Sequence, residues 1–115
     1  MSRFVALYRM PDDPGEFERQ YRESHLPLLA RTPGLATVEV SRVRRTVLGA
    51  PALYLMAVMD FPDDEALKAG MASPEWVESG RNLATIGGME LATMFILDDP
   101  ETVQVAAVGS DRDES

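Results

Sequence analysis

The sequence predicts an α+β fold of the ferredoxin-like type, in which helices pack on one four-stranded antiparallel sheet. The order of segments with strand-like and helix-like patterns is β-α-β-β-α-β. Both halves also place Pro-Asp-Asp where a strand passes into a helix, in RMPDDP and DFPDDE. The 115 residues suit a single domain, which we expect at residues 1–98, followed by an acidic C-terminal tail at 99–115.

The first half of the chain contains a strand, a helix and a second strand. Residues 3–9 are apolar and β-prone, and Asp13 after them is a favourable N-cap for a helix that starts at a proline. Glu16 is placed to close a capping box with Asp13. The helix is expected to end at the TPG of residues 32–34, and residues 35–45 are predicted to form the second strand.

The second half repeats this order, with a break in its helix. Residues 53–61 form the most hydrophobic predicted strand. A helix capped by Asp63 or Asp64 follows, and a second cap at Ser73, with a proline after it, restarts the helix up to a pair of glycines. Residues 89–98 complete the pattern as the last strand.

The strands carry apolar residues on both faces. In residues 53–61, Leu55, Ala57 and Met59 point one way, and Tyr54, Met56 and Val58 point the other. A sheet with helices on one face and water on the other alternates between apolar and polar residues instead. Because the chain has helices for only one face, we predict a homodimer in which two sheets pack face to face, a dimeric α+β barrel.

Negative charge is concentrated near the C-terminus. The net charge is −8, of which the residues from Asp98 onward contribute −5. We expect the tail at 99–115 to be partly disordered or packed at the dimer interface, with disorder at 109–115. Apolar and polar residues alternate in part of residues 101–108. Two interpretations of this segment stay open: an edge strand, or a segment that reaches across the dimer. The acidity, without a basic stripe, argues against nucleic acid as a partner.

Composition also bears on cofactors and location. The chain has no cysteine, which excludes disulfides and thiolate metal sites and fits a cytoplasmic protein. No apolar run approaches the length of a membrane span, so no membrane partner is expected. One histidine without a His-Glu spacing predicts no metal site, and the lack of glycine-rich nucleotide motifs predicts no nucleotide cofactor.

The stretch YRESHLPLL holds the only histidine, His25, two residues before Pro27. Pro27 has no N–H to donate and crowds the preceding turn, so we expect a helix kink just after His25. Helical spacing places His25 at the edge of the face that contains Phe17, Tyr21 and Leu28. Two interpretations stay open: an imidazole that faces a pocket, and one that is hydrogen-bonded at the end of a helical segment.

Several motifs together resemble the EthD family of dimeric α+β barrel proteins: LYRMPDDPGEF, Tyr21-x-x-x-His25-x-Pro27-Leu28, PGL and EVSRV. ASPEW and the late glycine pair also match, so the resemblance covers about residues 3–97. It implies a link to the degradation of ethyl tert-butyl ether and other hydrophobic organic compounds. In similar isomerases a histidine at the matching helix position does acid–base work, and a tyrosine often stands where this chain has Val38.

We therefore expect a small cofactor-free enzyme that acts on a hydrophobic ligand by isomerase, dehydratase or oxygenase-type chemistry. His25 is the predicted acid/base, since its ordinary pKa lies near neutrality, and Tyr21 and Glu39 are the candidates to assist it. The predicted substrate-binding residues are Tyr8, Arg42, Met56, Trp76 and Met94. The alternatives are a noncatalytic binding protein, in which these side chains only form core and interface, and haem binding through His25.

Overall fold

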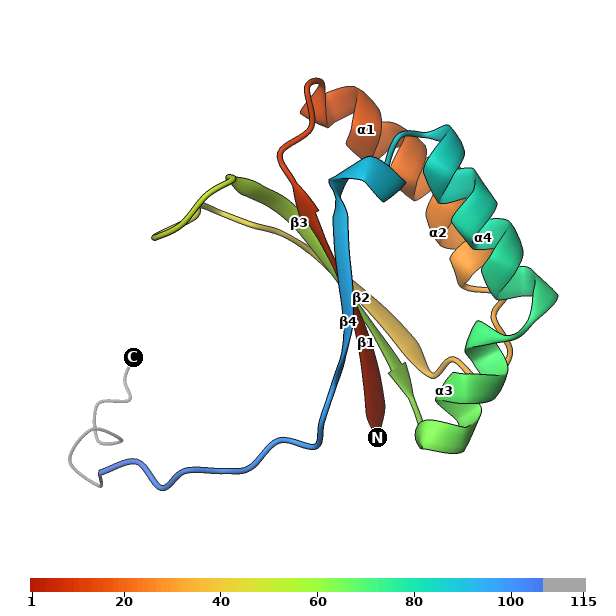
Figure 1. Cartoon of the computed structure of the whole chain (residues 1–115), viewed down its shortest axis with the longest axis vertical. Helices are drawn as coiled ribbons and strands as arrows, with labels where there is room; N and C mark the ends of the chain where they lie inside the picture. Colours follow the sequence, from red (N-terminus) through yellow and green to blue (C-terminus); the bar gives the residue numbers. More distant parts are fainter. Residues whose placement is uncertain (107–115) are drawn as a thin grey trace.

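Two strand–helix–strand units form the chain, and their helices all cover one face of a four-stranded antiparallel sheet (Figure 1). The computed structural model describes residues 1–106. The strand order is β2-β3-β1-β4, so the two strands with the most buried residues, β1 and β3, lie in the centre. The predicted ferredoxin-like α+β class is confirmed.

The first unit runs from the N-terminus to the second strand. Its elements are β1 (Ser2–Arg9), α1 (Pro14–Gln20), a π-helical turn (Tyr21–His25), α2 (Leu26–Leu29) and β2 (Thr37–Arg42). The second unit contains β3 (Leu53–Phe61), α3 (Asp64–Met71), α4 (Pro74–Thr85), a 3₁₀ turn (Met89–Leu91) and β4 (Ala92–Leu97).

The predicted helix caps are confirmed. The side chains of Asp13, Asp63 and Ser73 each accept a hydrogen bond from the backbone N–H three residues later, at 3.2, 2.8 and 3.2 Å. The capping box at Glu16 is wrong, because its carboxylate instead accepts hydrogen bonds from Arg19 and Gln20 on the exposed side of α1.

Two strands are shorter than predicted. β2 covers only Thr37–Arg42, and β4 starts at Ala92 because the three residues before it form a 3₁₀ turn. Residues 101–106 form no strand, so the described part of this segment adds no edge to the sheet of its own chain. The remaining tail predictions, including disorder at 109–115, fall largely outside the described residues.

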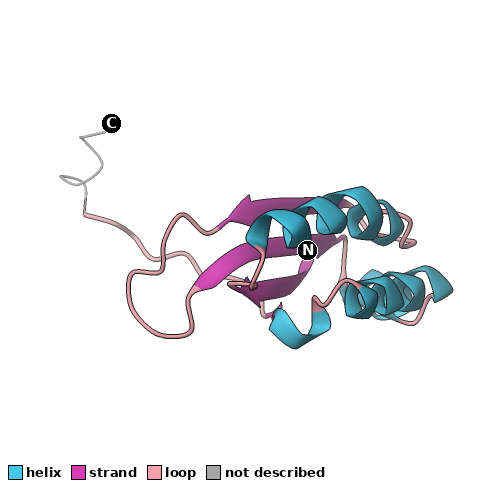
Figure 2. Cartoon of the chain, turned by 90° about the horizontal axis from the view of Figure 1, so that it is seen from above, coloured by secondary structure: helices cyan, strands magenta, loops and turns pink. Residues whose placement is uncertain are grey.

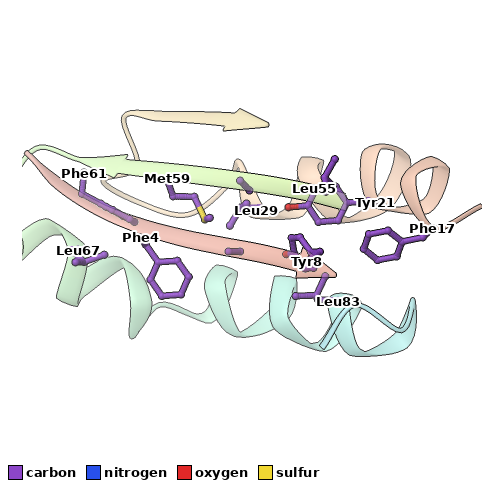
Figure 3. Packing of buried hydrophobic residues seen from close by; sticks show 12 residues of the cluster. Phe4, Tyr8, Phe17, Tyr21, Leu29, Leu55, Met59, Phe61, Leu67 and Leu83 are labelled. Atoms are coloured by element: carbon purple, nitrogen blue, oxygen red, sulfur yellow. The ribbon is translucent and has the colours of Figure 1, made fainter. Parts of the chain in front are cut away.

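The core lies between the sheet and the helices (Figure 3). Its largest fully buried side chains are Tyr8, Tyr21, Leu55, Phe61 and Leu83. The rings of Tyr8 and Tyr21 meet edge to face with centroids 5.2 Å apart, a favourable geometry for aromatic pairs. The first helical segment is thereby held against β1.

The other face of the sheet has no helices within residues 1–106 (Figure 2). Val5 is buried there by its neighbours, while Met56 and Val58 are half-buried. Phe95 and Leu97 on β4 are 38% and 46% exposed. This face, which we call the open face, is therefore apolar and uncovered in a single chain.

The helices of residues 1–106 are too short or too polar to cross a lipid bilayer.

Candidate active site

A π-helical turn carries His25. The backbone N–H of Leu26 donates to the carbonyl of Tyr21, five residues earlier, and α-helical bonding resumes from Ala30 to Leu26 at 2.9 Å. Pro27 follows this turn directly and has no N–H to donate to the helical carbonyls before it. A wider turn that ends at His25 thus precedes the proline, and the kink expected just after His25 stays a prediction. Such π turns occur frequently at functional sites.

The same turn changes which residues face the core. The buried residues of this segment are Phe17, Tyr21, His25 and Leu29, each four positions after the last. A regular α-helix would rotate such a series away from the core, because it has 3.6 residues per turn. A turn closed by a bond over five residues keeps them on one side. His25 therefore lies within the buried face, with 4% exposure, and not at its edge.

A pocket lies between this helical segment, α4 and the sheet. It contains about 380 Å³ of atom-free space that is partly open to solvent, of which about 60 Å³ admits the centre of a water molecule. Tyr8, Tyr21 and His25 form its polar side, with Ser79 of α4. The rest is apolar, from Phe4, Ala6, Leu29, Met59, Trp76, Gly80, Leu83, Met89 and Met94.

Charged side chains are absent from the lining of this pocket, as far as residues 1–106 form it. Burial lowers the pKa of His25, although the Ser79 backbone and the Asn82 side chain oppose this shift. Burial also raises the pKa of Tyr8, aided by the nearby Tyr21. The imidazole and the phenol are thus uncharged near pH 7, and the pocket offers neutral donors and acceptors only.

Some polar atoms around the pocket lack partners in the described chain. They are the hydroxyl of Tyr21, Nδ1 of His25 and the side-chain oxygen of Asn82, all fully buried. A buried polar atom without a hydrogen bond costs about 1–3 kcal/mol, so proteins retain such atoms mainly where a ligand, a water or a function uses them. Asn82 also donates to Ser24, next to His25, at 3.3 Å.

The structure brings five of the predicted residues together at this pocket: Tyr8, Tyr21, His25, Trp76 and Met94. The other three lie elsewhere. Glu39 is exposed on β2, opposite Val58, and Met56 lies opposite Leu7 and Ser41. Both positions are on the open face, so the sheet separates them from His25, and the predicted pairing of Glu39 with His25 does not form in the chain.

Arg42 is the third displaced residue, because it binds a carboxylate that sequence reasoning missed. Glu18 on α1 accepts hydrogen bonds from Arg42 at 2.8 Å, Tyr54 at 2.5 Å and Arg22 at 2.7 Å. These bonds, led by the one from Arg42, lower the pKa of Glu18 to about 2 despite its burial. Arg42 therefore connects α1 to the sheet and lies outside the pocket.

Other pocket residues were also missed. Ser79, Gly80 and Met89 come from α4 and the turn after it, and Asn82 of α4 acts on the pKa of His25 without lining the pocket itself. The one sequence signal for these residues was helical spacing, which places Ser79 and Leu83 on the same helix face as Trp76. Within residues 1–106, no three His, Asp or Glu side chains gather as a metal site would require.

Similarity to known proteins agrees with this fold. The profile of the EthD domain matches residues 11–82. A crystal structure of an ethyl tert-butyl ether (EthD) family protein from Bacillus halodurans is 31% identical, with a TM-score of 0.79, and covers 87% of this chain and 99% of that one. An uncharacterized 11.0 kDa protein in the thcB-thcC intergenic region of Rhodococcus erythropolis is 25% identical over 90% of this chain and 98% of its own.

More distant structures share the fold. SnoaB, a cofactor-independent oxygenase from Streptomyces nogalater, is 21% identical with a TM-score of 0.56 and covers 89% of this chain and 95% of that one. A dimeric ferredoxin-like protein of unknown function from Thermobifida fusca is 20% identical with a TM-score of 0.58, covering 84% and 86%. The profile match spans more than half of the sequence and includes Tyr21, His25 and Pro27. The chain therefore belongs to the EthD family.

Proposed function

We propose that this protein is a cofactor-independent enzyme that acts on a small, uncharged hydrophobic compound bound beside His25. The observation that carries this proposal is the gathering of His25, Tyr21 and Tyr8 at one apolar pocket with unpartnered polar atoms. The fold of SnoaB, which is a cofactor-independent oxygenase, supports the idea that this architecture accommodates catalysis without a cofactor.

His25 is suited to act as a base. Its burial favours the neutral ring, which holds a free electron pair on one nitrogen at neutral pH. In a substrate with a C–H bond next to a carbonyl, the imidazole would take the proton while the C–H electron pair moves to the carbonyl oxygen. Where a C=C bond adjoins that carbon, return of the proton to the far alkene carbon would complete an isomerisation without any co-reactant. An oxygenation would require molecular oxygen as the second substrate.

The two tyrosines are suited to bind the oxygen of such a substrate. Burial raises the pKa of both phenols, so each keeps its proton and can donate a hydrogen bond. Donors placed where negative charge develops are among the strongest contributions to catalysis. We assign Tyr21, whose hydroxyl has no partner in the described chain, as the main donor and Tyr8 as its neighbour.

The lining of the pocket selects against charged substrates. A carboxylate would lose its hydration without meeting a cation among the described lining residues, which is costly. Only about 60 Å³ of the pocket admits the centre of a water molecule, which favours a compound of about one ring. Cavities that hold larger, drug-sized ligands measure roughly 300–1,000 Å³. The small free space also speaks against the haem alternative, and Met59, Met89 and Met94 provide limited room for adjustment.

We also propose that the working form is a homodimer. The open face is apolar and uncovered, and the similar ferredoxin-like structure from Thermobifida fusca is described as dimeric. Two such faces packed together would bury Met56, Val58 and Phe95 away from water, in the manner of sheet-on-sheet packing.

A ligand screen followed by kinetics tests the enzyme proposal. Lactones, quinones, phenols and cyclic ketones are compared with matched carboxylic acids by thermal shift, where binding raises the melting temperature with concentration. For each compound that binds, turnover is measured with the wild type and His25→Ala. We expect uncharged compounds to bind and His25→Ala to lower turnover about 10²–10⁴-fold with binding nearly unchanged.

Four outcomes would contradict parts of this proposal. Full turnover by His25→Ala would remove the acid/base role, and preferential binding of the carboxylic acids would refute the uncharged class. Binding without turnover of any compound would favour the noncatalytic binding protein. A Soret band that appears with added haemin and is lost in His25→Ala would favour haem.

A further inference from the structure

Two apolar projections extend from the open-face side of the sheet. One is the β2–β3 loop, residues 43–52, where Val47 and Leu48 are 85% and 93% exposed. The other is the segment after β4, residues 98–106, which we call the C-terminal arm, where Val103 and Val105 are 77% and 75% exposed. Figures 1 and 2 both show these segments leaving the sheet on the side away from the helices. Neither has any cover within residues 1–106.

The projections lie at diagonally opposite corners of the sheet, at opposite ends of the strands and on its two edge strands, β2 and β4. The β2–β3 loop follows Arg42, which pairs with Leu55 at the end of the sheet near Arg9. The C-terminal arm follows Leu97, which pairs with Arg3 near the N-terminus. The length of the sheet therefore separates the loop from the arm within one chain, and they do not meet.

The two projections carry opposite charges. Arg44 and Arg45 lie at the base of the β2–β3 loop, and both are exposed. Asp98, Asp99 and Glu101 lie at the base of the arm, also exposed. None of these five side chains forms an ion pair within residues 1–106. Each projection thus starts with charged residues of one sign, which are followed by two large apolar side chains.

We infer that the C-terminal arm of one copy binds the β2–β3 loop of a second copy. If two open faces pack about a two-fold axis that runs along the other diagonal of the sheet, so that their strands cross, the arm of each chain meets the loop of its partner. The acidic residues at the start of the arm then meet the two arginines at the start of the partner's loop. The valines of the arm meet Val47 and Leu48 of that loop. An isologous dimer contains this contact twice, so a weak pair of interactions is doubled.

This inference rests on the proposed homodimer but not on the proposed chemistry. It assigns the arm and the loop as the elements that set the relative direction of the two sheets. Rim charges of this kind contribute mainly to specificity and orientation, while the apolar face provides most of the stability. A homodimer that lacks this contact is a possible result of the experiment below, so the two proposals are tested separately.

Charge exchange between two variants tests the contact. Variant one carries Arg44→Glu and Arg45→Glu, and variant two carries Asp98→Lys and Asp99→Lys. Each homodimer then has repulsion at both arm–loop contacts. In the mixed dimer, the wild-type arm of variant one meets the wild-type loop of variant two, and lysines meet glutamates at the other contact, so both contacts are attractive.

We expect each variant homodimer to dissociate at roughly tenfold or higher concentration than the wild type, by sedimentation velocity. Mixing of differently tagged variants should yield mainly heterodimer by native mass spectrometry, and high salt should remove this preference. A matched control, Arg31→Glu with Arg81→Glu on the helix layer, makes the same charge change and should dimerise like the wild type at equal salt. All changed residues are exposed, and circular dichroism verifies folding.

The inference is overturned if the mixture shows no heterodimer preference, if both variants dimerise as the wild type does, or if the control loses as much affinity as variant one. A monomeric wild type would overturn the homodimer as well. Val103→Asn with Val105→Asn gives a second measurement that involves no charge change. It should weaken the dimer, and unchanged affinity would remove the apolar part of the contact.

Discussion

The imidazole of His25 lies 4.9 Å, between ring centroids, from the phenol ring of Tyr21, four residues earlier in the same π-helical turn. Both side chains are buried, and both present polar atoms that have no partner within the described chain. A buried imidazole next to a buried hydroxyl suits the proposed transfer of a proton to and from a bound substrate.

Gly80→Ala should reduce ligand binding without harming the fold. A Cβ at this position would enter the pocket at an ordinary 3.7 Å from the terminal methyl of Met89, so no clash results. Alanine also favours the helix by up to about 1 kcal/mol. We expect an unchanged or higher melting temperature and roughly tenfold weaker binding of compounds found by the screen.

Gly15→Ala is the control for that change. It is also a helical glycine, but its Cβ would meet nothing within 4 Å and it lies outside the pocket. Its melting temperature should also hold or rise, while ligand affinity stays at the wild-type value by titration calorimetry. If Gly80→Ala binds ligands as tightly as Gly15→Ala does, the substrate lies elsewhere.

His25 should make the protein less stable as the solution is acidified. Burial lowers its pKa in the folded state below about 6.5, the value in an unfolded chain. As the pH falls from about 6.5 toward the pKa of the folded state, the unfolded chain binds a proton before the folded protein does. The free energy of unfolding therefore decreases as the pH falls through this window, and above about 6.5 His25 has no effect on it. His25→Phe, which cannot titrate, should show a smaller loss of melting temperature from pH 7.5 to 5.

The histidine resonance provides an independent check. Because the chain has one histidine, its NMR titration curve needs no assignment. A midpoint at or above about 6.5 would contradict the lowered pKa, as would identical pH dependence of the two melting temperatures. The same low pKa predicts that activity based on the neutral ring persists below pH 6.5.

Glu18→Gln should destabilise the protein by about 1–2 kcal/mol. The change replaces an acceptor of three hydrogen bonds with an amide that turns its own donors toward Arg42 or Arg22. The loss stays moderate because both arginine side chains, at 68% and 45% exposure, regain water. Chemical denaturation at pH 7 measures the effect.

The acid dependence of Glu18 has a defined sign. Its folded pKa of about 2 lies below the ordinary value of 4.5, so its contribution is complete above pH 4.5 and is lost as the pH falls toward 2. Glu23→Gln breaks only an exposed pair with Arg19 and should cost less than about 0.5 kcal/mol. Equal losses in the two variants would show that the Glu18 network does not hold α1 to the sheet.

Phe95→Asp should convert the dimer to monomer. Phe95 lies on the open face, opposite Val5, where the proposed homodimer would force a carboxylate into its packed interface. Val77→Asp, on exposed α4, introduces the same charge on the helix layer and should remain dimeric. Light scattering at micromolar concentration decides between them, and a dimeric Phe95→Asp would place the interface elsewhere.

Local signals allowed most of the fold to be predicted. Asp13, Asp63 and Ser73 cap helices through bonds within four residues, so the sequence alone located these starts. β3 was predicted with its observed limits because it is a continuous apolar run between turn residues. The ends of β2 and β4 were less accurate, since pairing with a neighbouring strand decides where a strand stops.

The sequence by itself determined the class of fold, its helix starts and the relation of Tyr21 to His25, since all of these depend on neighbours along the chain. Only the tertiary structure decided which side of the sheet each strand residue faces. Alternation divides the residues of a strand into two sets, and only the packing of the helices decides which set they cover. Glu39 and Met56 belong to the set on the open face, away from the pocket. The tertiary structure also decided that Arg42 meets Glu18 and that α4 supplies Ser79, Gly80 and Asn82, because these contacts join segments far apart in the chain.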